Sequence, residues 1–242
     1  MKNIIDIHNH ILYGVDDGAN SLSKSLKMLD LEYQQGVRDV IMTPHYVWGE
    51  CMPKEDRVKR HFDEIKKEIE KSHPDMNLYL GCEILAFEDI AEYLLEDRIR
   101  TMANSNYVLV EFNPTSTFSQ MERNIRDILN AGFMPIIAHC ERYAALRKRF
   151  GRIRKDLIMY LVEMGCYLQV NVESVLNKNR KFVDELIKME VLHFIASDAH
   201  SINHRGVHWD KCVESLKKKY PEYILNIILN ENPKKILKNK YI

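Results

Sequence analysis

Short apolar runs alternate with longer segments of helical pattern along this chain of 242 residues, and the alternation restricts its possible folds more than any other feature. The runs span residues 4–8, 39–43, 78–82, 107–111, 135–138, 167–171 and 193–197. Most are rich in Val, Ile and Leu without polar alternation, as are strands buried on both faces of a parallel sheet. Strands alternating with helices predict an α/β fold, either a barrel or a doubly wound sheet.

Glycines mark the ends of several predicted helices. Gly36, Gly132 and Gly165 each follow an apolar stripe of helical spacing, and glycine is the usual residue just after a helix. Residues 54–71 also read as a helix, but one so charged that a broad face must be solvated. No linker, repeat or low-complexity stretch divides the chain, so we expect a single domain over residues 1–242, about the size of one barrel.

The charge balance and the cysteines exclude several classes of protein. The chain has 35 basic and 35 acidic residues, so no net charge attracts nucleic acid or an anionic membrane. Its five cysteines are scattered and form no CxxC pair, which is typical of a reducing compartment. No secretory signal pattern and no apolar span of membrane length is present. We expect a cytoplasmic protein that is not inserted in a membrane.

Metal-binding residue types follow almost every predicted strand. In chain order they are His8 and His10, His45, Glu83, Glu111, His139, and Asp198 with His200. The carboxyl ends of parallel barrel strands meet on one face, where the active sites of such barrels lie. In the pair His8 and His10, residues i and i+2 point to the same side of a strand, so both imidazoles can bind one ion. Each residue alone is weak support for a site, but their coincidence predicts a metal centre.

The ligand types restrict the metal. Imidazoles and carboxylates without a thiolate suit Mn, Fe or Zn and disfavour a structural zinc site rich in cysteine. With Asp17 added, the candidates are too many for one ion, so we expect two or three divalent ions and one bridging carboxylate. Two ions a few ångströms apart lower the pKa of a bridging water and assist in-line displacement.

Two arginines close to the candidate ligands indicate an anionic substrate. Arg142 follows His139 by three residues, and Arg205 follows His200 by five. A guanidinium binds phosphate through two parallel hydrogen bonds. A surface salt bridge is the alternative role for each arginine.

An ordered set of motifs resembles a known superfamily. DIHNH, GVDDG, TPHY, GCEI, VEF, AHCERY and SDAH match, in order, the motifs of the PHP (polymerase and histidinol phosphatase) superfamily. GVDDG and AHCERY resemble more narrowly the bacterial manganese-dependent protein-tyrosine phosphatases of capsule and exopolysaccharide operons. The resemblance runs from about Asp6 to Leu237, nearly the whole chain.

The resemblance implies a distorted (β/α)7 TIM-like barrel with three metals, most often Mn, at the carboxyl ends of the strands. It assigns His8, His10 and Asp198 to one ion, Glu83 as a bridge to a second ion at Glu111 and His139, and Asp17, His45 and His200 to a third. It implies that Arg142 and Arg205 bind the phosphate, and Asp16 is expected only to cap the turn. Family members often have basic residues after the TPH motif, where this chain has Tyr46, Val47 and Trp48, so the substrate rim is not defined by the resemblance.

The activity that follows is hydrolysis of phosphotyrosine by a metal-bridging hydroxide. The family link implies an autophosphorylating bacterial tyrosine kinase as the substrate protein, in capsule or exopolysaccharide regulation. Oligomeric state is open. Three rival functions are a phosphatase of a small phosphomonoester such as histidinol phosphate, a non-catalytic metal-binding regulatory module, and a nuclease or proofreading domain. The neutral charge argues against the last.

One further pair of residues has the spacing found in a different class of phosphatase. Cys51 and Arg57 have the C-x5-R spacing of cysteine-dependent tyrosine phosphatases. The intervening residues include a proline and two acids and no glycine, whereas a phosphate loop needs free backbone N–H groups and an activated thiolate. We therefore expect no catalysis by Cys51.

Overall fold

The computed structural model describes residues 2–148, 152–203 and 205–242. The strands are β1 (Ile4–Asp6), β2 (Val37–Met42), β3 (His45–Tyr46), β4 (Asn77–Leu80), β5 (Glu83–Leu85), β6 (Tyr107–Glu111), β7 (Met134–Ile137), β8 (Tyr167–Asn171) and β9 (Phe194–Ala196). The α-helices are α1 (Leu22–Gln34), α2 (Glu55–Ser72), α3 (Ile90–Leu95), α4 (Phe118–Asn130), α5 (Lys155–Glu163), α6 (Val172–Leu176), α7 (Arg180–Lys188), α8 (Trp209–Lys217), α9 (Glu222–Asn226) and α10 (Asn232–Leu237). Short 3-10 turns are η1 (Met102–Asn104), η2 (Cys140–Arg142) and η3 (Ala144–Leu146), and a π-helical turn, η5 (Ile227–Glu231), joins α9 to α10.

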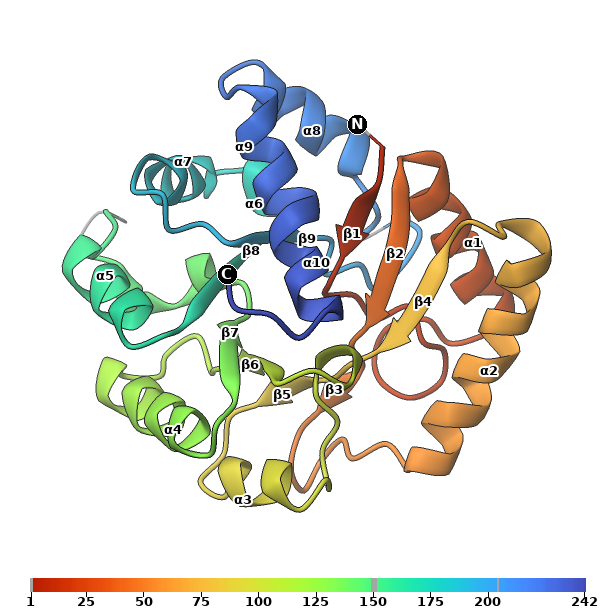
Figure 1. The fold of residues 1–242 in the computed structure, drawn as a ribbon, viewed down its shortest axis with the longest axis horizontal. Helices are drawn as coiled ribbons and strands as arrows, with labels where there is room; N and C mark the ends of the chain where they lie inside the picture. Colours follow the sequence, from red (N-terminus) through yellow and green to blue (C-terminus); the bar gives the residue numbers. More distant parts are fainter. Residues whose placement is uncertain (1, 149–151, 204) are drawn as a thin grey trace.

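The named strands pair in parallel and curl into a barrel with helices outside it (Figure 1). One sheet has the order β1-β2-β4 and the other the order β3-β5-β6-β7-β8-β9. β3 continues the line of β2, and β5 continues that of β4, so seven strand positions surround the axis. A parallel bridge between Asn9 and Ala199 joins the end of β1 to the end of β9. The expected α/β barrel is confirmed.

Two strand positions are interrupted because of local backbone chemistry. Pro44 lies between β2 and β3 and has no N–H to donate to a ladder. Gly81 lies at the matching point between β4 and β5, and its N–H donates to the Met42 carbonyl at 2.8 Å. The next bond, from the Glu83 N–H to the Pro44 carbonyl at 3.1 Å, restores the pairing. Both breaks occur just before a candidate ligand, so that His45 and Glu83 are the first residues of β3 and β5.

The helix ends agree with the glycine positions. Gly36, Gly132 and Gly165, which follow α1, α4 and α5, have φ values of +98°, +88° and +105°. Only glycine adopts this left-handed region without strain, so each residue ends its helix as predicted. The charged helix α2 buries only a narrow stripe of Val58, Ile65 and Ile69.

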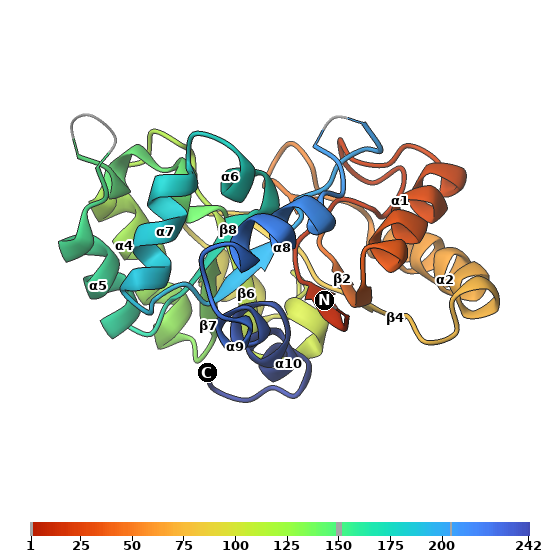
Figure 2. The same ribbon diagram turned by 90° about the horizontal axis from the view of Figure 1, so that it is seen from above.

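The barrel interior is apolar at one end and polar at the other. Its apolar cluster includes Ile5, Ile41, Leu109, Ile136 and Phe194, together with Ile236 from α10. Figure 1 shows α10 crossing the front of the barrel, and Figure 2 places α9 and α10 below it. The end left for chemistry is therefore the one that carries the carboxyl ends of the strands.

Among the described residues, no helix combines the length and apolar character needed to cross a membrane.

Candidate metal centre

All nine candidate ligands lie together at the carboxyl ends of the strands. They form four overlapping groups, and within each group the possible ligand atoms lie within 4.8 Å of one another. The groups are His8, His10 and Asp198; His8, Glu83 and His139; His45, Glu83 and Glu111; and His10, Asp17, His45 and His200. The strand ends thus bring together residues from both ends of the chain, as the barrel predicts.

Glu83 lies at the middle of the cluster. Its Oε1 is 3.2 Å from His8 Nε2 and 2.9 Å from His139 Nε2. Its Oε2 is 3.2 Å from His10 Nε2 and 3.0 Å from His45 Nδ1. A single buried carboxylate that faces four imidazoles can be shared between two cations.

Two outer carboxylates complete the cluster. Glu111, at the end of β6, lies 3.4 Å from His139 Nε2 and 3.9 Å from His45 Nδ1. Asp17 lies 3.4 Å from His45 Nε2 and 3.5 Å from His200 Nε2. The Asp17 side chain is 64% exposed, whereas Glu83 is buried, so Asp17 forms the solvent side of the centre.

Fixed partners hold several imidazoles by their second nitrogen. His10 Nδ1 lies 2.8 Å from Asp16 Oδ2, and His200 Nδ1 lies 2.8 Å from the backbone carbonyl of Asp198. Both oxygens are acceptors, so in a neutral, metal-binding imidazole each Nδ1 carries the proton and each Nε2 keeps its lone pair. Partners of this kind orient metal-binding histidines in proteins.

Many polar atoms of the cluster are buried without a hydrogen bond. They are His8 Nε2, His10 Nε2, His45 Nδ1, Glu83 Oε2 and His200 Nε2. A buried polar atom without a partner costs free energy, and such atoms need an explanation in a native protein. These atoms point toward one another and are all of metal-ligand type, so the residues fit a cluster of divalent cations.

The electrostatics of the cluster agree with that fit. Burial by itself raises the pKa of Glu83, but the charge of His8 and hydrogen bonds from neighbouring imidazoles hold that pKa well below its usual range. Burial lowers the pKa of His10, yet Asp16, Asp198 and Glu83 outweigh it and raise the pKa well above its usual value. Burial and the nearby His10 charge lower the pKa of His200 to about 3. The buried Glu83 and Asp198 carboxylates, whose pKa values are held well below the usual range, are therefore ionised and favour cations beside them.

Both candidate arginines lie beside the cluster and contact Asp198. Arg142, at the end of η2, donates to Asp198 Oδ2 at 2.7 Å. Arg205 donates to Asp198 Oδ1 at 2.9 Å and to Oδ2 at 3.0 Å. A cavity of about 240 Å³ opens beside Asp198 and Arg205, with Asn171 and His208 in its wall. The two guanidinium groups thus meet at the Asp198 carboxylate, and Arg205 also lines the cavity.

The backbone is strained at three of these positions. His139, Asp198 and Arg205 have φ values of +31°, +51° and +51°, in the left-handed region that side chains disfavour. Such residues cost about 1–3 kcal/mol each and concentrate at functional sites. All three belong to the candidate ligands or to the candidate phosphate-binding arginines, so the strain coincides with the site.

The structure argues against catalysis by Cys51. Its Sγ lies 3.6 Å from the Val15 carbonyl and 3.8 Å from that of His45. Burial, together with the charges of Asp16 and Asp17, raises the pKa of the thiol. A nucleophilic cysteine needs the opposite shift, so the C-x5-R spacing is coincidental.

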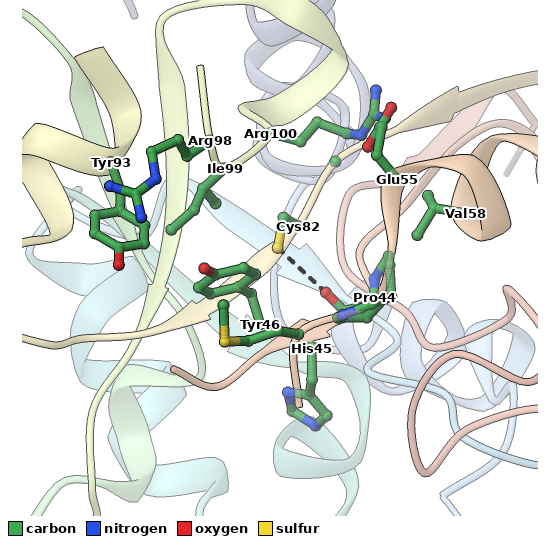
Figure 3. Close-up of a pocket in the computed structure, with 13 residues that line it drawn as sticks. Pro44, His45, Tyr46, Glu55, Val58, Cys82, Tyr93, Arg98, Ile99 and Arg100 are labelled. Carbon is green, nitrogen blue, oxygen red and sulfur yellow. Dashed lines mark hydrogen bonds and ion pairs between the residues drawn. The ribbon is translucent and has the colours of Figure 1, made fainter. Parts of the chain in front are cut away.

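A second cavity, also about 240 Å³, lies behind β3 and away from the cluster. Figure 3 shows the Tyr46 ring among Tyr93, Arg98 and Ile99, while the His45 imidazole turns away from them. Consecutive side chains of a strand point to opposite faces, which explains the separation. His45 is therefore the one candidate ligand among the residues that line this cavity, and its imidazole turns toward the metal-binding cluster.

Two kinds of contact in the cluster were not expected from the sequence. Asp16 caps its turn as predicted, by accepting from the Gly18 N–H at 3.0 Å, but it also orients His10. Gln169 and Asn171 of β8, both buried, contact His8 and Asp198. The acidic pair after the GV motif hinted at the first contact, whereas no metal-binding residue type marked β8.

Comparisons with known proteins agree with this geometry. The family model described as "Capsular polysaccharide synthesis, CpsB/CapC" matches residues 4–238. The tyrosine-protein phosphatases CpsB of Streptococcus agalactiae and Streptococcus pneumoniae are 30% and 31% identical to this chain, over 99% of it and 100% of their own lengths.

A solved structure is also similar over nearly its whole length. It comes from work on YwqE of Bacillus subtilis and CpsB of Streptococcus pneumoniae, described as unique metal-dependent tyrosine phosphatases. It superposes with a TM-score of 0.88 at 28% identity and covers 99% of this chain and 96% of its own. The narrower resemblance to bacterial tyrosine phosphatases of capsule synthesis is confirmed, and this chain belongs to the CpsB/CapC family of capsular polysaccharide synthesis.

Proposed function

We propose that this chain is a metal-dependent protein-tyrosine phosphatase. The observation that carries the proposal is the cluster of buried ligand-type atoms without hydrogen bonds, lying beside two arginines. The similarity to proteins named tyrosine-protein phosphatase, over nearly the full length of both chains, supports the same activity. The Arg142 and Arg205 pair accounts for binding of a phosphate group.

The nine clustered side chains would hold the divalent ions. His8, His10 and Asp198 would bind the first, Glu111 and His139 the second, and Asp17, His45 and His200 the third, with Glu83 shared between the first two. The imidazole and carboxylate set supports Mn, with Fe and Zn as other metals of matching preference. When bound, such ions supply Lewis-acid stabilisation of negative charge and ease the deprotonation of water.

The chain's own residues then orient the substrate. Arg142 and Arg205 would donate to the phosphoryl oxygens, since both guanidinium groups face the same carboxylate beside the cavity. Charge that develops on those oxygens strengthens these hydrogen bonds. A tyrosine phenolate has a pKa near 10 and leaves more easily than an alkoxide. A strong general acid is therefore not essential.

An exposed aromatic side chain just after β3 supports a protein substrate. Trp48 is 54% exposed, stacks on Phe87 and donates to the Tyr93 hydroxyl at 3.0 Å. It follows β3, the strand that presents His45 to the cluster. A polypeptide on either side of the phosphotyrosine can pack on this surface, whereas a small phosphomonoester would not need it. We propose a cytoplasmic, autophosphorylating bacterial tyrosine kinase as the substrate protein.

The test compares metal-stripped protein, the same protein with Mn²⁺ restored, and restored protein treated with iodoacetamide, each on a phosphotyrosine peptide. We expect activity only with Mn²⁺ and no effect of alkylation. Activity that survives stripping and disappears on alkylation would assign the reaction to Cys51 and overturn the proposal. His10→Ala and Glu83→Ala should abolish turnover in folded protein.

The same preparation separates the rival functions. Histidinol phosphate and other small phosphomonoesters are assayed beside the phosphotyrosine peptide. Preference for the small substrates by a factor of about 10 or more in kcat/KM would favour a small-molecule phosphatase. Tight Mn²⁺ binding without hydrolysis of either class would favour the non-catalytic module.

A further inference from the structure

We infer that Gln169 and Asn171 of β8 form a buried hydrogen-bond relay that positions two ligands, His8 and Asp198, for the first metal ion. The inference rests on the proposed metal centre. β8 carries no metal-binding residue type at its carboxyl end, unlike its neighbours β7 and β9. It contributes amide side chains instead, and both lie inside the barrel with almost no exposure.

The relay has four continuous contacts. Gln169 Oε1 lies 2.7 Å from the His139 backbone nitrogen and 3.2 Å from His8 Nδ1. Gln169 Nε2 donates to Asn171 Oδ1 at 2.9 Å. Asn171 Nδ2 donates to Asp198 Oδ2 at 2.6 Å. A second backbone contact, from the Asn171 N–H to Glu141 Oε1 at 3.1 Å, fixes the end of the strand.

The direction of every bond in the relay is determined at both ends. The His139 backbone N–H can only donate, so the oxygen of the Gln169 amide must face it. The ionised Asp198 carboxylate can only accept, so the nitrogen of the Asn171 amide must face that. Both constraints require that Gln169 Nε2 donates to Asn171 Oδ1. Turning either amide over would place two donors or two acceptors against each other, which is costly in a buried network.

The orientation decides the tautomer of His8. Because Gln169 Oε1 is an acceptor, the proton of a neutral His8 imidazole lies on Nδ1. The lone pair then lies on Nε2, the atom that is 3.2 Å from Glu83 Oε1, 3.5 Å from Asp198 Oδ1 and without a hydrogen bond. Without the relay, the proton could move to Nε2 and form a hydrogen bond with Glu83. The relay therefore keeps the metal-binding nitrogen free and holds the opposite carboxylate in place.

The test measures Mn²⁺ affinity in Gln169→Met and Asn171→Leu, which keep approximate size and remove the polar atoms. Loss of a hydrogen-bond partner of a metal ligand weakens metal binding by about 10- to 100-fold, and we expect losses of this size for each variant. The matched control is Tyr167→Phe, on the same face of β8 but at the other end of the strand, with an expected change below about twofold. Circular dichroism establishes that each variant is folded.

Two further readouts separate positioning from a general structural role. The double variant should lose little more affinity than the weaker-binding single variant, because the two amides act as one chain. In ¹⁵N-histidine NMR spectra of metal-free protein, His8 should be protonated on Nδ1 in the wild type and shift toward Nε2 in Gln169→Met. Fully additive losses, an unchanged tautomer, or a dissociation constant within twofold of wild type would overturn the relay. Wild-type protein that binds Mn²⁺ but does not hydrolyse phosphotyrosine would overturn the proposed function and leave the relay intact.

Discussion

At the scale of single residues, Glu83 determines the electrostatics of the centre. It is almost fully buried and lies within 3.2 Å of four imidazole nitrogens. A buried carboxylate without cationic partners would be strongly destabilising, so its charge and those of its neighbours are mutually dependent. Residues that change the position of one imidazole should therefore affect the whole cluster.

Gly18 is such a residue, because it packs against the back of His10. A Cβ on Gly18 would lie inside contact distance of the His10 carbonyl oxygen and 2.5 Å from the His10 Cβ. Gly18→Ala should lower the free energy of unfolding by about 1–3 kcal/mol through overpacking, and weaken Mn²⁺ binding as His10 moves. Urea unfolding and metal titration measure the two effects.

Gly49→Ala is the matched control for Gly18→Ala. Gly49 has φ of +80°, and an added Cβ would meet nothing within 4 Å. It should cost about 1 kcal/mol of backbone strain and leave Mn²⁺ affinity unchanged. Equal losses of metal affinity in the two variants would contradict the close-packing argument.

The arginines give a second prediction at this scale. Arg142→Lys and Arg205→Lys keep the charge but lose the planar fork that binds phosphate through two hydrogen bonds. Hydrogen bonds to a charged group contribute about 1.5–3 kcal/mol, so kcat/KM on a phosphotyrosine peptide should fall by about 10- to 100-fold in each variant. The number of Mn²⁺ ions bound, measured by elemental analysis, should not change. A variant with wild-type kcat/KM would show that its arginine is a structural partner of Asp198 only.

The sequence predicted residue types better than it predicted their contacts. His8, His10, Glu83 and Asp198 are all of types that bind metals, and each follows an apolar strand. Gln169 is not recognisable in this way, because an amide on a buried strand has no characteristic spacing. The left-handed backbone at His139 could not be predicted from the sequence either. Strained torsion angles depend on the surrounding packing and not on the local sequence.

At the scale of elements, the junction of β8 and β9 contains a pH-sensitive histidine. His193 precedes β9, and its Nδ1 accepts from the Leu168 N–H at 3.0 Å. Burial lowers the pKa of His193 to about 4, against about 6.5 in an unfolded chain. Between these values the unfolded state binds more protons, so the stabilisation by neutral His193 is full above pH 6.5 and is lost as the pH falls toward 4.

His193→Asn tests this contribution because it keeps a short polar acceptor that cannot titrate. Between pH 7 and pH 4.5, wild-type protein should lose more free energy of unfolding than the variant, by up to about 3 kcal/mol. Urea unfolding at each pH gives the free energy of unfolding of both proteins. Subtracting one from the other removes the effect of every titrating group that both proteins have. Parallel losses in the two proteins would show that His193 titrates normally in the folded state.

The elements themselves were largely predictable, since long apolar runs and terminal glycines are local features. The expected strand at residues 107–111 corresponds to β6, and that at residues 167–171 corresponds to β8. The breaks between β2 and β3 and between β4 and β5 were not expected. They depend on Thr43–Pro44 and Gly81–Cys82 lying side by side in neighbouring strands, and one sequence does not show which residues are neighbours across a sheet.

At the scale of the whole molecule, the barrel separates stability from chemistry. The apolar cluster that includes Ile5 and Phe194 fills one end, to which α10 contributes Ile236, whereas the candidate ligands lie at the carboxyl ends of the strands. Figure 2 shows α10 below the strands. The ligands come from segments near both ends of the chain, so metal binding should add to the Asn9–Ala199 bridge and to the hydrogen bond from the Asp198 N–H to the His8 carbonyl, which already join those segments. Metal and apolar packing then stabilise the same fold through different contacts.

Ile236→Ala tests that separation. Ile236 is fully buried in the apolar cluster, and truncating it should cost about 2–5 kcal/mol in free energy of unfolding. Mn²⁺ at about 100 times its dissociation constant should add roughly 2.7 kcal/mol to both wild-type and variant protein, because the ion binds the folded state only and its ligands do not contact α10. Ile227→Ala, at a more exposed position of the same C-terminal helical segment, should change the stability little. Unfolding curves with and without Mn²⁺ measure all of these terms, and a smaller metal increment in Ile236→Ala would mean that the two ends of the barrel are coupled through the strands between them.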